Sequence, residues 1–83
     1  MTTDDIRAAV LASLADVAPE ADAATIEPTV PLQEQLDLDS MDFLTLLSGV
    51  ADRTGVEVPE RDYAEVASLQ GCVDYVAAAL AAA

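Results

Sequence analysis

A single serine lies among carboxylates near the middle of the chain, in the segment LDLDSMDF at residues 36–43. Ser40 follows a proline-containing stretch and precedes an amphipathic pattern, so we expect it at or near the beginning of a helix. Unpaired backbone N–H groups and the positive end of the helix dipole favour an anion at such a position. A serine hydroxyl there is suited to carrying a phosphodiester.

The same residues allow other interpretations. Serine near a helix start is often an ordinary N-cap, while a carboxylate just before it could orient an incoming cofactor or bind a metal used by a modifying enzyme. A calcium loop could be built on Asp37, Asp39 and Asp42. Such loops need a central glycine and a closing glutamate, and this segment lacks both. An aspartyl nucleophile would need a base or metal on a larger scaffold, and the chain has no histidine or lysine. We therefore expect no intrinsic metal site and no autonomous enzyme.

The strongly acidic composition limits the kinds of partner that the protein can bind. Sixteen acidic residues face three arginines, which gives a formal net charge of −13 on 83 residues. This charge argues against binding to nucleic acid or to anionic membranes and predicts basic protein partners. The simpler alternative is that the acids only keep an alanine-rich surface soluble.

Length and cysteine content indicate one small domain without a disulfide. Cys72 is the only cysteine, and it falls on the apolar stripe of the last helical pattern, so we expect a buried thiol in a reducing compartment. No apolar run is long enough to span a bilayer, and no secretory leader opens the chain. The expected location is the cytoplasm.

Apolar spacing predicts helices over residues 4–18 and 40–54 and a last helix after Ser68. Asp39 and Ser68 are expected N-caps, and Gly55 fits the left-handed position after a helix. The inner stripes are Ile6, Val10, Leu14 and Val17; Leu44, Leu47 and Val50, widened by Phe43 and Leu46; and Leu69, Val73, Val76 and Leu80.

The connecting segments complete the expected fold. Residues 19–38 hold three prolines and predict a long loop packed across helix ends, with room for a short helical turn at residues 32–36. Residues 56–59 read as an extended connector, and residues 60–66 as a short helix. The fold class is therefore all-α: a small four-helix bundle with three longer helices, one short helix and a long loop between the first two.

This order of elements, together with the D-S pair at Asp39-Ser40, resembles the acyl carrier proteins over nearly the whole chain, from about Ile6 to Leu80. The connector VEVP at residues 56–59 and the SLQ and VDYV strings in the last helix also match the family. The resemblance implies a non-catalytic, monomeric carrier. Ser40 would receive 4′-phosphopantetheine from coenzyme A, through a phosphopantetheinyl transferase and magnesium.

The terminal thiol of that arm would hold an acyl group as a thioester and carry it between enzymes. The implied partners are an acyl-loading ligase or acyltransferase and a ketosynthase or other acyl-processing enzyme of fatty-acid, polyketide or related biosynthesis. Asp39, Met41 and Asp42 would be recognised by the modifying enzyme and by partners. Candidate lining residues of an acyl cleft, or else core residues, are Leu44, Leu47, Val50, Tyr63 and Val66.

Two departures from the family pattern point to a variant carrier. Asp37 stands where the family often has glycine, and the peptidyl type usually has two glycines there. After Asp42 the next acid of the second helix is Asp52, whereas fatty-acid carriers bear a row of glutamates on this helix. We therefore expect a more apolar partner surface and a dedicated set of partners. Tyr63 would either limit the length of the cargo or fill the core, and core filling is the preferred interpretation.

Two alternatives stay open at this point. An aminoacyl or peptidyl carrier loaded by an adenylating ligase would differ in its cargo. An acidic protein-interaction module without a cofactor would not depend on Ser40.

Overall fold

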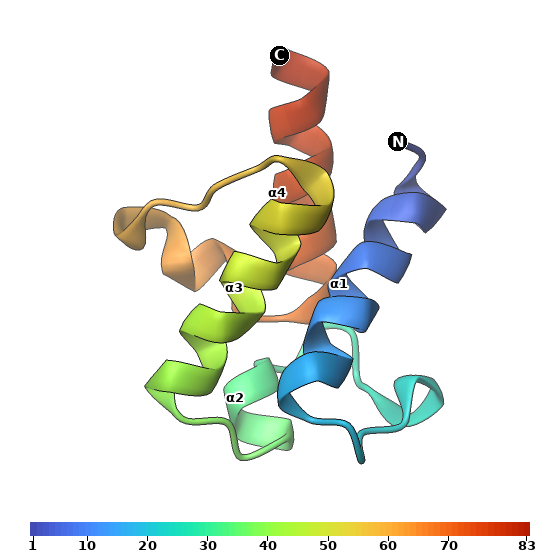
Figure 1. Cartoon of the computed structure of the whole chain (residues 1–83), viewed down its shortest axis with the longest axis vertical. Helices are drawn as coiled ribbons and strands as arrows, with labels where there is room; N and C mark the ends of the chain where they lie inside the picture. The colour runs from blue at the N-terminus through green and yellow to red at the C-terminus, as the bar shows by residue number, and fades with distance from the viewer.

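The computed structural model describes the whole chain, residues 1–83, and every regular element in it is a helix (Figure 1). The elements, with η marking 3₁₀ helices, are α1 (Thr3–Val17), η1 (Ala23–Thr25), α2 (Leu32–Gln35), α3 (Ser40–Thr54), η2 (Glu60–Val66) and α4 (Leu69–Ala82). Three long helices with η2 as the short fourth confirm the predicted all-α bundle. The short helical turn predicted in the long loop is present as α2, whereas η1 was not predicted.

Helix α1 begins and ends for local reasons. Thr2 and Asp5 form a capping box, in which each side chain accepts a backbone N–H from the other residue at 3.1 Å. The bond from the Thr2 N–H holds the pKa of the Asp5 carboxyl below its ordinary value. Pro19 disfavours a helical conformation at Ala18, which is accordingly the C-cap. The helix therefore lies one residue earlier than the predicted range 4–18.

The long loop between α1 and α3 is fixed to the far end of the chain by two backbone hydrogen bonds. The N–H of Leu32 donates to the carbonyl of Ala67 at 2.8 Å, and the N–H of Gln70 donates to the carbonyl of Pro28 at the same distance. Leu32 itself is fully buried. The loop is thus packed across helix ends, as the sequence predicted, and it holds α2 beside the beginning of α3.

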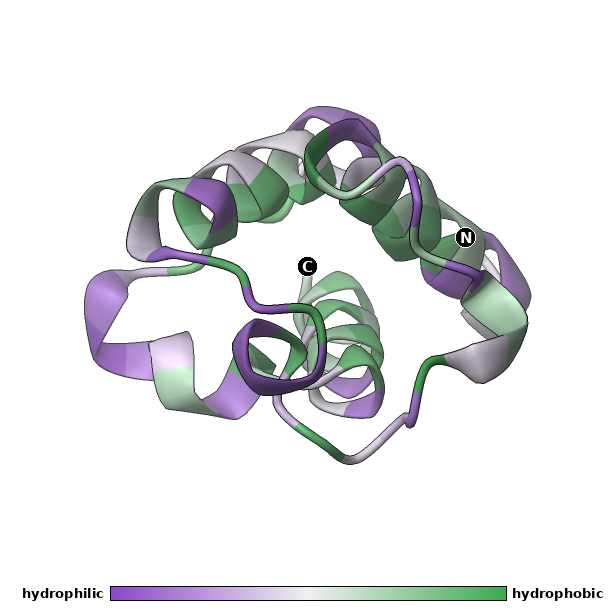
Figure 2. Ribbon diagram, turned by 90° about the horizontal axis from the view of Figure 1, so that it is seen from below, coloured by the Kyte–Doolittle hydropathy of each residue, from purple (hydrophilic) through white to green (hydrophobic).

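The three long helices enclose one aliphatic core. Helix α1 packs against both α3 and α4, and η2 packs against α4. In Figure 2, α4 is seen nearly along its axis, with α1 and α3 arching over one side of it. Most of the predicted stripe residues are buried, but Leu44 is 43% exposed and does not belong to the inner face of α3. That face consists of Phe43, Leu46, Leu47 and Val50.

Helix η2 is held against α4 by a close backbone approach and a side-chain bond. A Cβ atom added at Gly71 of α4 would lie within van der Waals overlap of the Glu65 carbonyl oxygen, so only glycine permits this approach. The Tyr75 hydroxyl donates to the Asp62 carboxylate at 2.7 Å, and this bond raises the pKa of Tyr75. The position of η2 therefore depends on α4.

Candidate functional site

Ser40 is the first residue of α3 and leaves the capping role to its neighbour. The Asp39 carboxylate accepts the N–H of Asp42 at 2.8 Å, and the Asp42 carboxylate faces the Asp39 N–H at 3.4 Å. Asp39 is therefore the N-cap, as predicted, and the alternative in which Ser40 is an ordinary N-cap is wrong. Both carboxylates predicted to act in recognition fix the geometry of this helix start.

The Ser40 hydroxyl is exposed and has no hydrogen-bond partner within the protein. The backbone N–H groups of Ser40 and Met41 likewise donate to no protein acceptor. A nucleophilic oxygen and two free donors thus share the first turn of a helix of 15 residues. This arrangement fits a phosphodiester on Ser40, because the free donors and the helix dipole favour its negative charge.

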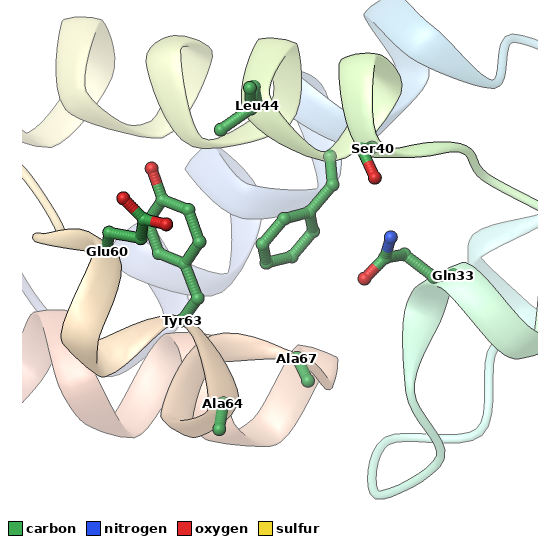
Figure 3. A pocket seen from close by; sticks show the side chains of 8 residues that line it. Gln33, Ser40, Leu44, Glu60, Tyr63, Ala64 and Ala67 are labelled. Carbon is green, nitrogen blue, oxygen red and sulfur yellow. The ribbon is translucent and has the colours of Figure 1, made fainter.

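A cavity of about 560 Å³ opens directly beside Ser40. Its walls come from α2, α3, η2 and the residue after η2: Gln33, Ser40, Phe43, Leu44, Glu60, Tyr63, Ala64 and Ala67. Figure 3 shows Leu44 and Ser40 on α3, facing Tyr63, Ala64 and Ala67 across the hollow, with the Gln33 amide pointing toward Ser40. A group attached to Ser40 would therefore have an apolar surface within immediate reach.

A second cavity of about 640 Å³ continues along α3. It shares Leu44 and Tyr63 with the first cavity and reaches Ala51 and the extended connector at Val58 and Pro59. We call the two adjoining cavities together the α3 groove. From Ser40 to Ala51 the groove follows about 16 Å of helix, at about 1.5 Å per residue.

The structure separates the five residues predicted as either cleft or core. Leu44 and Tyr63 line both cavities, and Leu47 lines the second from a mostly buried position. Val50 and Val66 are fully buried in the core and line neither cavity. Tyr63 is half-buried, and it packs against the core as well as facing the groove.

Several lining residues were not anticipated as site residues. Phe43 is 6% exposed, yet its ring borders the first cavity and meets Tyr63 edge-on, with centroids 5.6 Å apart and an interplanar angle of 81°. Gln33, Glu60, Ala64 and Ala67 carry no motif and reach the site only because α2 and η2 fold beside α3. Hydrophobic periodicity indicated Phe43 as a core residue, but nothing in the sequence indicated the other four.

Met41 is the most exposed large apolar side chain of the molecule, at 72%. It lies one residue after Ser40, and Leu44 is exposed one turn further along α3. No acid stands between Asp42 and Asp52 on this helix. The surface beside Ser40 is therefore more apolar than the net charge of the chain suggests.

No three histidine, cysteine, aspartate or glutamate side chains are grouped so as to hold a metal ion. None of the helices has the length and apolar character needed to cross a membrane.

Asp37 precedes the site in a left-handed conformation, with φ at 53°, and is the only non-glycine residue with positive φ. Because the left-handed region is unfavourable for a residue with a Cβ atom, we expect Asp37→Gly to raise the free energy of unfolding by up to about 1 kcal/mol. Urea unfolding measures this change. Glu20→Gly removes the same charge at an exposed loop position of negative φ and is expected to destabilise the protein. Equal effects of the two variants would contradict the backbone explanation.

Comparison with known proteins agrees with this geometry. The family model described as the phosphopantetheine attachment site matches residues 8–76. An acyl carrier protein of Myxococcus xanthus is 29% identical over 70 residues, which cover 81% of this chain and 89% of the relative. An acyl carrier protein of Micrococcus luteus is also 29% identical over 70 residues, which cover 81% of this chain and 86% of the relative. Because the family match spans most of its length, the chain belongs to the acyl carrier protein family, whose cofactor is 4′-phosphopantetheine.

Proposed function

We propose that Ser40 carries the phosphopantetheine arm. The observation that supports this most directly is its exposed and unpartnered hydroxyl, in the first turn of α3 and at the edge of the first cavity. In the reaction, the Ser40 Oγ forms a bond to the phosphorus that bears pantetheine in coenzyme A. The bond from that phosphorus to adenosine 3′,5′-bisphosphate breaks, and the serine proton passes to a base of the transferase. The proposal assigns the base to the transferase because no side chain of the protein hydrogen-bonds the Ser40 hydroxyl.

The protein then acts as a non-catalytic carrier of acyl groups. The arm supplies a thiol that holds the cargo as a thioester, and attachment to a small protein raises the effective concentration of cargo at each partner. The proposed partners are the phosphopantetheinyl transferase, a loading ligase or acyltransferase, and a ketosynthase or other acyl-processing enzyme. We place this monomeric carrier in the cytoplasm, because its only cysteine is unpaired and buried, as is usual in reducing compartments.

The surface of α3 favours a dedicated pathway of fatty-acid, polyketide or related biosynthesis. Exposed Met41 and Leu44 offer partners an apolar contact beside Ser40, in place of a row of acids. The aminoacyl or peptidyl carrier is the second candidate, and loading assays with acyl and amino acid substrates separate the two. A cofactor-free interaction module requires that replacement of Ser40 has no effect on function.

The direct test is incubation with coenzyme A, magnesium and a broad-specificity phosphopantetheinyl transferase, followed by intact mass measurement. The proposal predicts a gain of one phosphopantetheine group per chain. An unchanged mass, with protein from the native host also unmodified, would overturn it.

Asp39 allows the capping role to be separated from a role of its charge in modification. Asn caps a helix about as well as Asp, whereas Ala lowers stability by about 1 kcal/mol. We expect Asp39→Asn to keep the unfolding free energy but to lower kcat/KM of the transferase by about ten- to a hundredfold, as for loss of one charged contact. Asp39→Ala should lower both the unfolding free energy and kcat/KM of the transferase. Normal modification of Asp39→Asn would show that Asp39 is only a cap.

Cys72 should not interfere with measurements of the thiol on the arm. The side chain is fully buried, and burial raises the pKa of its thiol to about 11. The thiol is therefore neutral and shielded at pH 8, where native apo protein should react negligibly with a disulfide reagent and holo protein should react once per chain. Because the pKa in the folded state is raised above the ordinary thiol value of 9.0, the neutral thiol favours folding below about pH 9, and this contribution is lost as pH rises toward 11. Fast reaction of native apo protein would contradict the buried position, and Cys72→Ala is the control.

A further inference from the structure

The proposed carrier function leaves open where the cargo lies, and the packing beside Ser40 bears on that question. The interior next to the groove contains no space for an acyl chain. Leu46, Val50 and Val66 are at most 1% exposed, and no cavity lies among them. The one cavity with an entirely apolar lining lies elsewhere, where α1 ends, and its volume is only about 90 Å³.

Phe43 and Tyr63 stand between the groove and this core. Phe43 comes from α3 and Tyr63 from η2, so their edge-to-face contact at 5.6 Å joins the two walls of the first cavity. Val66, three residues after Tyr63 on η2, is fully buried. An acyl chain entering the core would have to separate the two rings and displace side chains that are already close-packed.

The two cavities of the groove adjoin at Leu44 and Tyr63, and both are open and only partly apolar. Leu44 and Tyr63 lie in both of its halves, and Ala51, Val58 and Pro59 extend the apolar surface away from Ser40. Polar groups occur along the same path, namely Gln33, Glu60, Ser48 and Glu57. The Gln33 amide has no hydrogen-bond partner in the protein and points toward Ser40 (Figure 3).

We propose that the Phe43–Tyr63 pair closes the core to cargo, so that the acyl group lies along the α3 groove in partial contact with water. This inference rests on the proposed attachment at Ser40. A long alkyl chain gains little in such a groove, because much of its surface stays hydrated. The cargo class that fits is a short acyl group, or a longer one bearing hydroxyl or keto oxygens that the polar groups of the groove can bind.

The test uses the full chain loaded with octanoyl-phosphopantetheine and, separately, with its 3-hydroxy analogue. Intact mass first confirms loading, and methyl NMR spectra are then compared with those of the holo form. We expect shift changes at Leu44 and Val58, in the groove, and none at Val50 and Val66, in the core. Nuclear Overhauser contacts from the end of the octanoyl chain to Val50 or Val66 would overturn the inference and leave the carrier function intact.

Variants of the aromatic pair test whether these rings are the barrier. The two variants are Tyr63→Ala and, as a milder change that keeps apolar volume, Phe43→Leu. In each variant we expect contacts between the octanoyl chain and Val66. We also expect the octanoyl form of each variant to unfold at a higher temperature than the holo form of the same variant. Leu11→Ala removes apolar volume beside the remote cavity and should keep the wild-type pattern. If both aromatic variants kept the octanoyl contacts of the wild type, the two rings would not be the barrier. Failure of the wild-type chain to gain any arm would overturn the proposed function and this inference together.

Discussion

Ser40→Ala is expected to abolish arm attachment completely while leaving the fold unchanged. The hydroxyl is exposed and makes no protein hydrogen bond, so its removal breaks no internal contact. The N-cap belongs to Asp39, which the substitution leaves in place. We therefore expect an unfolding free energy within about 0.5 kcal/mol of wild type, as for a neutral surface change. Mass measurement and urea unfolding of the same sample check both parts.

Two other serines serve as controls for this variant. Ser48 is exposed on the same helix, and Ser48→Ala should be modified like the wild type. Ser68 caps α4 by accepting the N–H of Gly71 at 3.0 Å, so Ser68→Ala should lose about 1 kcal/mol of stability and still be modified. A phosphopantetheine group on Ser40→Ala, or its loss in Ser48→Ala, would contradict the assignment.

Gly71→Ala should produce the largest loss of stability among single-methyl additions. The added Cβ would overlap the Glu65 carbonyl oxygen, which is backbone and cannot rotate away as the end of a side chain can. Overpacking of this kind lowers the unfolding free energy by about 1–3 kcal/mol, which exceeds the gain of up to about 1 kcal/mol from replacing a helical glycine. Helix η2 should move away from α4 and carry Tyr63 with it, which changes the shape of the α3 groove.

Gly49→Ala provides a graded comparison for Gly71→Ala. Its Cβ would lie 3.0 Å from both the Cβ and the Oγ of Ser13 and 3.2 Å from Arg53 Nη1, which is a milder overlap than the one at Gly71 and needs a smaller shift of the neighbouring atoms. We expect a smaller loss of stability and no change in the groove, which urea unfolding and the NMR signals of Tyr63 measure. A larger effect at Gly49 than at Gly71 would contradict the backbone explanation.

Local features of the chain are what sequence alone could predict. The cap at Asp39 and the left-handed Gly55 follow from residue type and position, and the structure has both. The place of Ser40 at the start of α3 follows from the same cap. The all-α bundle follows from three apolar stripes separated by proline-rich or extended connections.

The parts that could not be predicted depend on tertiary packing. Phe43, Leu44, Leu46 and Leu47 are apolar and nearly consecutive, so the pattern admits more than one inner stripe. The packing of α1 against α3 decides between them and leaves Leu44 exposed to the groove. Glu60, Ala64 and Gln33 carry no local signal, because their place in the site is set by the contacts of η2 with α4 and of the long loop with Ala67.

The central claim, that Ser40 carries the arm, is tested most directly on protein purified from its native host. Trypsin can cut after Arg7, Arg53 and Arg61, so Ser40 lies on peptide 8–53 together with Ser13 and Ser48, and fragmentation must locate any modification within it. Attachment at Ser40 predicts phosphopantetheine on this peptide, with every fragment that contains residue 40 shifted and none that excludes it. An arm on Ser13, Ser48 or Ser68, or a chain that is wholly unmodified, would contradict the claim.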